Sequence, residues 1–239
     1  MSILIYLILG FLTSLLFPPY FFLPLGFIIF PILCLLLDAN KENYSDLNNF
    51  KNFSIFGFGF FISFLFWVKN PFFVFEETKN YFLFFLLLII LLSIILSTIF
   101  TITLKLGKKI PIIFLIPFMF TITEYIISVF IYGFPWFTFS LVISSNLYLL
   151  FLLKLFGTII SSYLIIQIFC LPFIVLTKKN FKKELICFSL ITIIPIIWFL
   201  ISNFNLQKEN LKPKSINLEI FQLNFQNNNK SLNPEKKLN

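Results

Sequence analysis

The sequence predicts an all-α polytopic membrane protein with about seven transmembrane helices. Three observations lead to this fold class: the composition, a series of long apolar runs, and the distribution of lysines. Of the 239 residues, 59% are hydrophobic and only 12% are charged, and the mean hydropathy is +0.97. Soluble domains are about half apolar and about a quarter charged. This chain has too little polar surface to cover an exterior that faces water, so lipid is its expected solvent.

Apolar runs that approach the length of a membrane span follow one another along the chain. A spanning helix needs about 20 mostly apolar residues. Residues 18–20 separate the first two runs and predict a tight hairpin, because proline can end one helix and open the next without losing a needed hydrogen bond. The runs cover residues 3–17, 21–37, 53–68, 81–104, 110–131, 134–153, 155–176 and 185–201.

The run 134–153 is ambiguous, because several serines and an asparagine interrupt it. Lysine placement favours seven spans, with this run re-entrant or at the outer surface. Nine lysines then lie in cytoplasmic loops, against three on the opposite side before the tail. If the run crossed, the split would be six against six, without the excess of cytoplasmic lysine that membrane proteins show. The predicted topology has a cytoplasmic N-terminus and an external tail, which is periplasmic in a Gram-negative host.

The composition changes sharply after Leu206. We therefore divide the chain into a transmembrane helical domain, residues 1–206, and a polar C-terminal segment, residues 207–239. Within this segment, residues 216–221 alternate apolar and polar side chains, the pattern of a half-buried strand. A single strand without a partner is not stable in water. We expect the chain to stop where a soluble domain begins.

The composition also argues against several kinds of chemistry. The chain contains no histidine, so it cannot carry out histidine-dependent catalysis. Cys34, Cys170 and Cys187 each lie in an apolar run without CxxC spacing, and we expect buried, reduced thiols. The net charge of +8 reflects lysine-rich loops rather than affinity for nucleic acid. We expect no metal and no cofactor, and we interpret the 38 phenylalanines as residues that fill lipid-facing positions.

Glu124 lies in the middle of the run 110–131. A carboxylate at this depth costs about 2.5–3.5 kcal/mol, so it should face the bundle interior or a wet cavity. Two interpretations stay open. Glu124 borders a substrate cavity, or it is a neutral packing residue that is hydrogen-bonded by the hydroxyls of Thr121, Thr123 or Tyr125.

The sequence Gly133-Phe134-Pro135-Trp136 follows this helix. By itself it indicates a helix stop, a turn and an aromatic anchor at the membrane surface, which is typical of an ordinary loop. Glu76 and Glu77 fall in a loop with lysines on both sides, and we interpret them as solvated charges.

Four stretches, in the same order, resemble the family of bacterial apolipoprotein N-acyltransferases. Residues 17–24, which read FPPYFFLP, resemble the family's first membrane hairpin, and residues 57–60 resemble its glycine-rich third span. Glu124, with the sequence 133–136 beginning nine residues later, resembles its most recognisable membrane segment. Residues 218–222 resemble the first strand of its nitrilase-like α/β domain. The resemblance covers essentially the whole chain.

The resemblance implies a two-step acyl transfer. In the family, a cysteine thiol of the nitrilase-like domain takes an acyl chain from a membrane phospholipid as a thioester. The amino group of a diacylglyceryl-cysteine lipoprotein then receives the chain. The implied partners are therefore phospholipid, lipoprotein and the bacterial inner membrane. Carried onto this sequence, the expected substrate-binding residues are Glu124, Gly133, Phe134, Pro135 and Trp136.

The family's catalytic Glu, Lys and Cys lie beyond the first strand of the nitrilase-like domain. We therefore expect no catalytic residue and no activity from this chain, which resembles a truncated or split form, and a separate nitrilase-like chain would be its partner. The sequence departs from the family near Glu124, since Ile127 and Ser128 stand where an Arg-Gly pair is usual.

Two alternative functions remain at this point. One is a small multi-span lipid or solute transporter, which would show matching halves with polar residues inside the membrane. The other is a structural membrane subunit of a split enzyme, which would co-purify with its partner.

Overall fold

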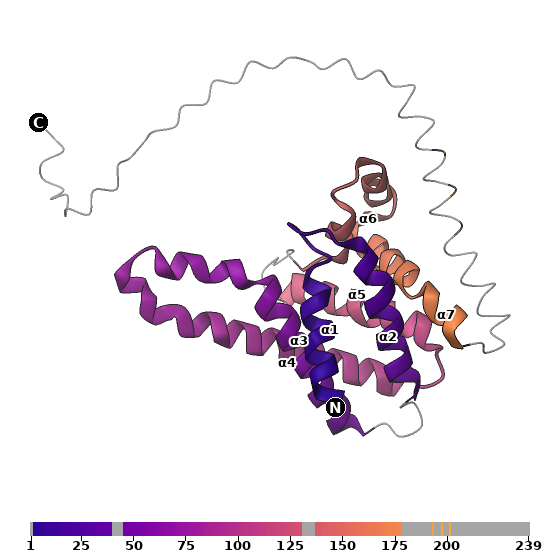
Figure 1. Cartoon of the computed structure of the whole chain (residues 1–239), viewed down its shortest axis with the longest axis horizontal. Helices are drawn as coiled ribbons and strands as arrows, with labels where there is room; N and C mark the ends of the chain where they lie inside the picture. The colour runs from indigo at the N-terminus through magenta and orange to yellow at the C-terminus, as the bar shows by residue number, and fades with distance from the viewer. Residues whose placement is uncertain are drawn as a thin grey trace, which may run out of the picture.

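The computed structural model describes residues 2–39, 45–130 and 137–177, together with positions 193, 197 and 201. The described residues form a helical bundle without strands (Figure 1), as the all-α prediction requires. The predicted strand at 216–221 and the rest of the segment 207–239 lie outside the described residues. The α-helices are α1 (Ser2–Ser14), α2 (Gly26–Ala39), α3 (Asp46–Phe64), α4 (Phe82–Leu106), α5 (Ile112–Phe130), α6 (Leu147–Phe169) and α7 (Leu171–Thr177). The 3-10 helices are η1 (Leu23–Leu25), η2 (Phe66–Phe73), η3 (Glu76–Tyr81) and η4 (Phe139–Ile143).

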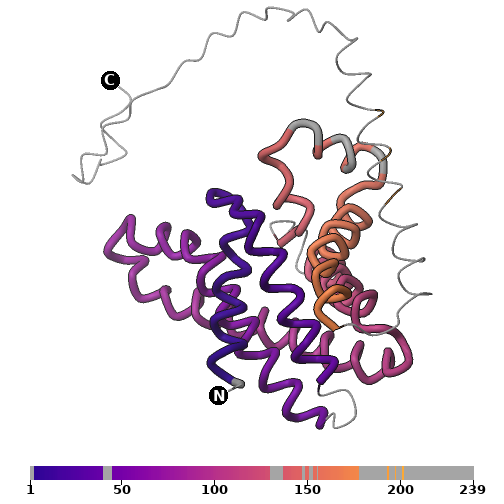
Figure 2. Tube along the Cα trace, turned by 45° about the vertical axis from the view of Figure 1, so that its right-hand side comes forward, coloured from indigo at the N-terminus to yellow at the C-terminus, as the bar shows by residue number. Residues whose placement is uncertain are grey.

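Neighbouring helices pack in an order that partly follows the chain. Helix α1 packs on α3, α3 on α4, α4 on α5, and α5 on α6, while α2 contacts α5, α6 and α7. Figure 1 shows α3 and α4 side by side in a long hairpin that protrudes from the bundle, with η2 and η3 forming its tip. The predicted hairpin of the first two runs is also present, and Figure 2 shows α1 and α2 joined by a tight turn.

Fewer helices have the length of a membrane span than the sequence predicts. Within the described residues, three helices are long and apolar enough to cross, namely Glu76–Leu106, Ile112–Val129 and Phe156–Thr177. A fourth candidate is Asp46–Phe64 with Phe66–Phe73, which bends by 53°. The apolar helices Ile3–Ser14 and Leu23–Ala39 are shorter. The total of seven spans stays a prediction, because most of the run 185–201 lies outside the described residues.

The ambiguous run 134–153 does not form one straight helix in its described part. After Thr138, which is extended, η4 makes a short buried turn, and α6 begins only at Leu147. Helix α6 is itself broken at Gly157, where the backbone has φ 69° and ψ 179°. This form agrees with a run that does not cross as a single helix. Its place relative to the two membrane surfaces stays a prediction.

The prediction that the phenylalanines fill lipid-facing positions is right for some, such as Phe84 and Phe118, which are exposed, and wrong for others. Many are buried in the bundle interior, and several, including Phe17, Phe60 and Phe139, have 2% exposure or less. Their rings make edge-to-face contacts across helices, such as Phe100 with Phe120 at 4.8 Å between centroids. Such pairs stabilise by about 0.5–1.5 kcal/mol beyond the burial of their area. Aromatic packing is therefore a main feature of this core.

Glycines allow α1 and α3 to approach closely. A Cβ atom built on Gly59 would lie 2.5 Å from the carbonyl oxygen of Leu7 in α1, and one on Gly10 would overlap the backbone of α3 at Phe56. Membrane helices associate largely through such close packing, because lipid provides no hydrophobic drive between them. Gly59, in the second half of α3, thus has a structural role.

Candidate functional site

Glu124 is buried in the interior of the bundle, with 2% of its surface exposed. It projects from α5 (Ile112–Phe130). This placement confirms that the carboxyl group faces the bundle interior rather than lipid. A polar group at this depth must find hydrogen-bonding partners within the protein.

The partners of Glu124 come from the segment that leads into η4 and from α6. The backbone N–H of Phe139 donates to Oε2 of Glu124 at 3.2 Å. The hydroxyls of Thr138 and Ser162 also hydrogen-bond to the carboxyl group. Because all three partners act as donors, the carboxyl oxygens serve as acceptors, which is what a carboxylate does best.

Ser162 extends this network by one further bond. Its Oγ accepts the backbone N–H of Ser140 at 2.9 Å. The first N–H groups of any helix lack acceptors within the helix. In η4 (Phe139–Ile143), the side-chain oxygens of Glu124 and Ser162 serve as these acceptors. One side chain from α5 and one from α6 therefore hold the start of η4 between the two helices.

The hydroxyls that the sequence suggested as hydrogen-bonding partners of Glu124 are not its partners in the structure. Thr121 and Thr123 donate instead to carbonyl oxygens of their own helix, at Pro117 (2.6 Å) and Met119 (2.8 Å). Tyr125 points away from the interior, with half of its surface exposed. Hydroxyls in a helix commonly bond back to the carbonyl four residues earlier, and this local bond removed both threonines as partners.

An aromatic shell surrounds the carboxyl network. The ring of Phe139 contacts the rings of Phe17, Phe30, Phe120 and Phe137, with centroids 5.0 to 5.9 Å apart. Phe17 belongs to the hairpin that follows α1, so distant parts of the chain meet at η4. The apolar shell excludes water from the network and strengthens its hydrogen bonds.

The other predicted substrate-binding residues, Gly133, Phe134, Pro135 and Trp136, lie outside the described residues. They immediately precede the anchored segment in the chain. The sequence prediction did not include Thr138, Phe139 or Ser162. The only signal for them was the presence of small polar residues in otherwise apolar runs, at 138–140 and 161–162.

The described cysteines are not placed for nucleophilic chemistry. Cys34 and Cys170 are free and buried, with no exposed surface, as the sequence predicted, and Cys187 lies outside the described residues. Among the described residues, no group of three His, Cys, Asp or Glu side chains could hold a metal ion. What the site can do is position a segment of backbone, because its groups hold η4 rather than present a nucleophile.

Comparisons with known proteins identify the family of this chain. A scan against models of protein families matches the apolipoprotein N-acyltransferase N-terminal domain over residues 9–171. A search of curated proteins found none that matches the chain. The family match includes Glu124, η4 and Ser162 and covers more than half of the 239 residues. The chain therefore belongs to the apolipoprotein N-acyltransferase N-terminal domain family.

Proposed function

We propose that this chain is the membrane part of an apolipoprotein N-acyltransferase and docks its lipid substrates. The reaction transfers an acyl chain from a membrane phospholipid to the N-terminal diacylglyceryl-cysteine of a lipoprotein. Both substrates are held in the bilayer, so a helical bundle must bring their reactive ends to the nucleophile. The proposed location is the bacterial inner membrane, with residues 207–239 on the periplasmic side.

The observation that carries this proposal is the anchoring of η4 by Glu124 and Ser162. The anchored segment directly follows residues 133–136, which we propose to lie under the reacting groups. Substrate-positioning elements act by holding reactants in the productive geometry, and a displacement of about 1 Å can slow a reaction roughly a hundredfold. Glu124 is thus proposed as a positioning residue.

The nucleophile is proposed to come from a nitrilase-like domain. Cys34 and Cys170 are enclosed in the apolar core and cannot reach a lipoprotein amino group. We expect residues 1–239 to transfer no acyl group by themselves, and measured transfer by the purified chain would contradict this.

The test is an acyl-transfer assay in membranes that contain this chain and a nitrilase-like domain supplied as a separate polypeptide. Wild type is compared with Glu124→Gln, Glu124→Ala and Ser162→Ala, and Glu77→Gln in the exposed η3 is the matched control. Gln keeps an acceptor for the N–H of Phe139 but loses acceptor capacity for the two hydroxyls. We expect a graded loss of kcat, reaching roughly a hundredfold for Glu124→Ala, and no change in the control.

Two outcomes would contradict the proposal in different ways. If no combination with the wild-type chain gives transfer, the proposed reaction is wrong. If transfer occurs but Glu124→Ala retains full kcat, the reaction stands and the positioning role of Glu124 is wrong.

A further inference from the structure

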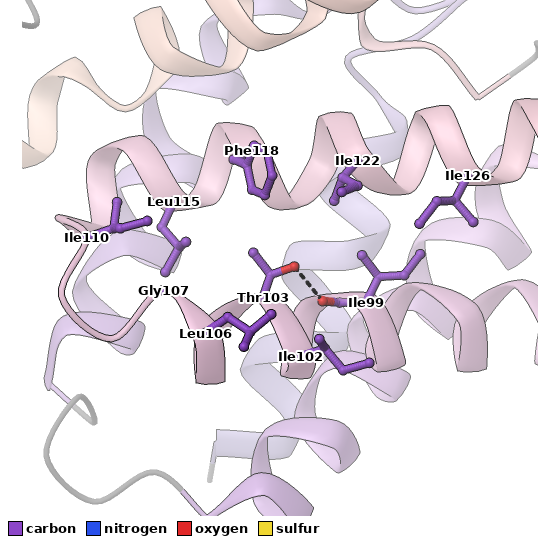
Figure 3. A pocket seen from close by; sticks show the side chains of 10 residues that line it. All are labelled: Ile99, Ile102, Thr103, Leu106, Gly107, Ile110, Leu115, Phe118, Ile122 and Ile126. Carbon is purple, nitrogen blue, oxygen red and sulfur yellow. Dashed lines mark hydrogen bonds between the residues drawn. The ribbon is translucent and has the colours of Figure 1, made fainter.

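An apolar groove runs along the outer surface of the bundle between α4 and α5. Figure 3 shows the two helices side by side with the lining side chains between them. The groove has a volume of about 370 Å³, which lies within the range of small-molecule pockets. Its lining consists of Ile99, Ile102, Thr103, Leu106, Gly107, Ile110, Leu115, Phe118, Ile122 and Ile126.

The groove offers almost no polar group to an occupant. The one hydroxyl in its lining, on Thr103, donates to the carbonyl oxygen of Ile99 at 2.7 Å (Figure 3). Several lining side chains face outward, with exposures of 52% for Ile102 and 47% for Phe118. The groove therefore opens toward the surrounding lipid and suits a hydrocarbon chain.

The length of the groove fits one acyl chain of one leaflet. Its lining on α5 extends from Leu115 to Ile126, which is roughly 16 Å at 1.5 Å per residue. The hydrocarbon core of a bilayer is about 30 Å thick. A phospholipid tail spans one of the two leaflets, so it extends across about half of this thickness.

One end of the groove carries positive charge. Gly107 and Ile110 line this end, and between them the turn from α4 to α5 holds Lys108 and Lys109, both exposed. The salt bridges of the described residues join Lys79 to Glu76 and Lys105 to Asp46, so neither turn lysine is paired with a carboxylate there. Two ammonium groups that are unpaired within the described part of the chain thus lie where the headgroup of a lipid in the groove would be.

We propose that the α4–α5 groove is a binding site for an anionic phospholipid of the phosphatidylglycerol type. One acyl chain occupies the groove, and the phosphate lies between Lys108 and Lys109. Basic pockets between membrane helices are the usual sites for such headgroups. This site is separate from the acyl-transfer site, because the groove lies on the outer face of α5 whereas Glu124 is buried on the inner face of the same helix. The charged end of the groove is also at the start of α5, away from Glu124. The proposal does not depend on the acyl-transfer function.

The test uses the full chain purified in detergent, titrated with phosphatidylglycerol or phosphatidylcholine and monitored by native mass spectrometry. We expect one phosphatidylglycerol to bind more tightly than phosphatidylcholine. Near an anionic lipid, each lysine contributes about fivefold in affinity, so Lys108→Gln and Lys109→Gln should each raise the Kd about fivefold. Ile122→Trp, which fills the groove, should abolish retention of both lipids.

Matched controls separate this site from general attraction to lipid. Lys51→Gln removes an exposed lysine of α3, and Ile90→Trp places the same ring on an outward face of α4 away from the groove. Neither should change the Kd. Equal affinity for the two lipids, or unchanged Kd in the groove and turn variants, would overturn the proposal. A change of oligomeric state in Ile122→Trp with lipid binding intact would instead identify a second copy of the chain as the occupant, and would also overturn it.

Discussion

Two buried polar side chains of this bundle differ in how their hydrogen bonds are satisfied. Glu124 has three donors from two other segments. Gln167 in α6 has no exposed surface, and neither its side-chain nitrogen nor its oxygen has a hydrogen-bonding partner among the described residues. An unpaired buried polar group costs about 1–3 kcal/mol, so the two residues should respond to substitution in opposite ways.

Replacing Gln167 by Met should stabilise the protein. Methionine has nearly the same shape and needs no hydrogen bonds, so the free energy of unfolding should rise by about 1–3 kcal/mol. Thermal unfolding in detergent, followed by circular dichroism, measures this. Gln167→Ala is the control, because it removes the amide but leaves a cavity, and it should give no gain. A lower melting temperature for Gln167→Met would show that the amide has a partner.

Replacing Phe139 by Ala should destabilise the protein. Its ring contacts four other rings, and removing a buried phenylalanine costs about 3–5 kcal/mol. The same unfolding measurement applies, with Phe84→Ala as the control, since Phe84 is 61% exposed. Similar losses in both variants would mean that the aromatic cluster around η4 is not a stabilising core.

At the level of single residues, the sequence predicted Glu124 as part of the site but not its partner Ser162. Glu124 could be predicted because a carboxylate at bilayer depth must face inward. Ser162 could not, because it is 38 positions away in the chain and a serine in an apolar run carries little signal. Thr121 and Thr123 were closer but already bonded within their own helix.

Among the helices, the tightest contact is between α1 and α3. Gly59→Ala would place a methyl group 2.5 Å from the backbone oxygen of Leu7, which cannot move without shifting α1. We expect a loss of about 1–3 kcal/mol in unfolding free energy. Gly57→Ala is a matched control, because its Cβ would lie 3.1 Å from Ser93 in α4, a contact that a small shift relieves. Equal losses in the two variants would contradict a special role for the α1–α3 contact.

The positions of α4 and α5 were predicted well, whereas α1, α2 and α3 have other bounds than the apolar runs that predicted them. Hydropathy marked α4 and α5 to within a few residues, because lysines and a Gly-Lys-Lys-Ile-Pro turn bound them. Hydropathy overestimated the length of α1, since the apolar run continues to Phe17 although the helix ends at Ser14. Apolar composition does not distinguish a helical residue from one in the turn before a proline.

For the whole molecule, the α3–α4 hairpin makes the topology testable. Helix α4 has 25 residues, or roughly 38 Å, so the η2–η3 tip and the Asp46 end should lie on opposite sides of the membrane. In a background with the three cysteines replaced by alanine, we expect an impermeant maleimide to label Glu77→Cys and Ser215→Cys in intact cells. Asn48→Cys should react only after the membrane is opened. Labelling of Ser215→Cys only in opened cells would contradict an odd number of spans.

The short first helix has a consequence for the lipid around the protein. Helix α1 has 13 residues, roughly 20 Å, and presents Ile3, Leu4 and Phe11 outward. Helix α4 is nearly twice as long. If both helices cross the membrane, as the sequence predicts, a bilayer of uniform thickness cannot match both. The bilayer must then become thinner beside α1, and beside α4 either the bilayer becomes thicker or the helix tilts. The protein thus imposes a thickness gradient on its annulus, and bilayers with shorter tails should accommodate its α1 side at lower elastic cost.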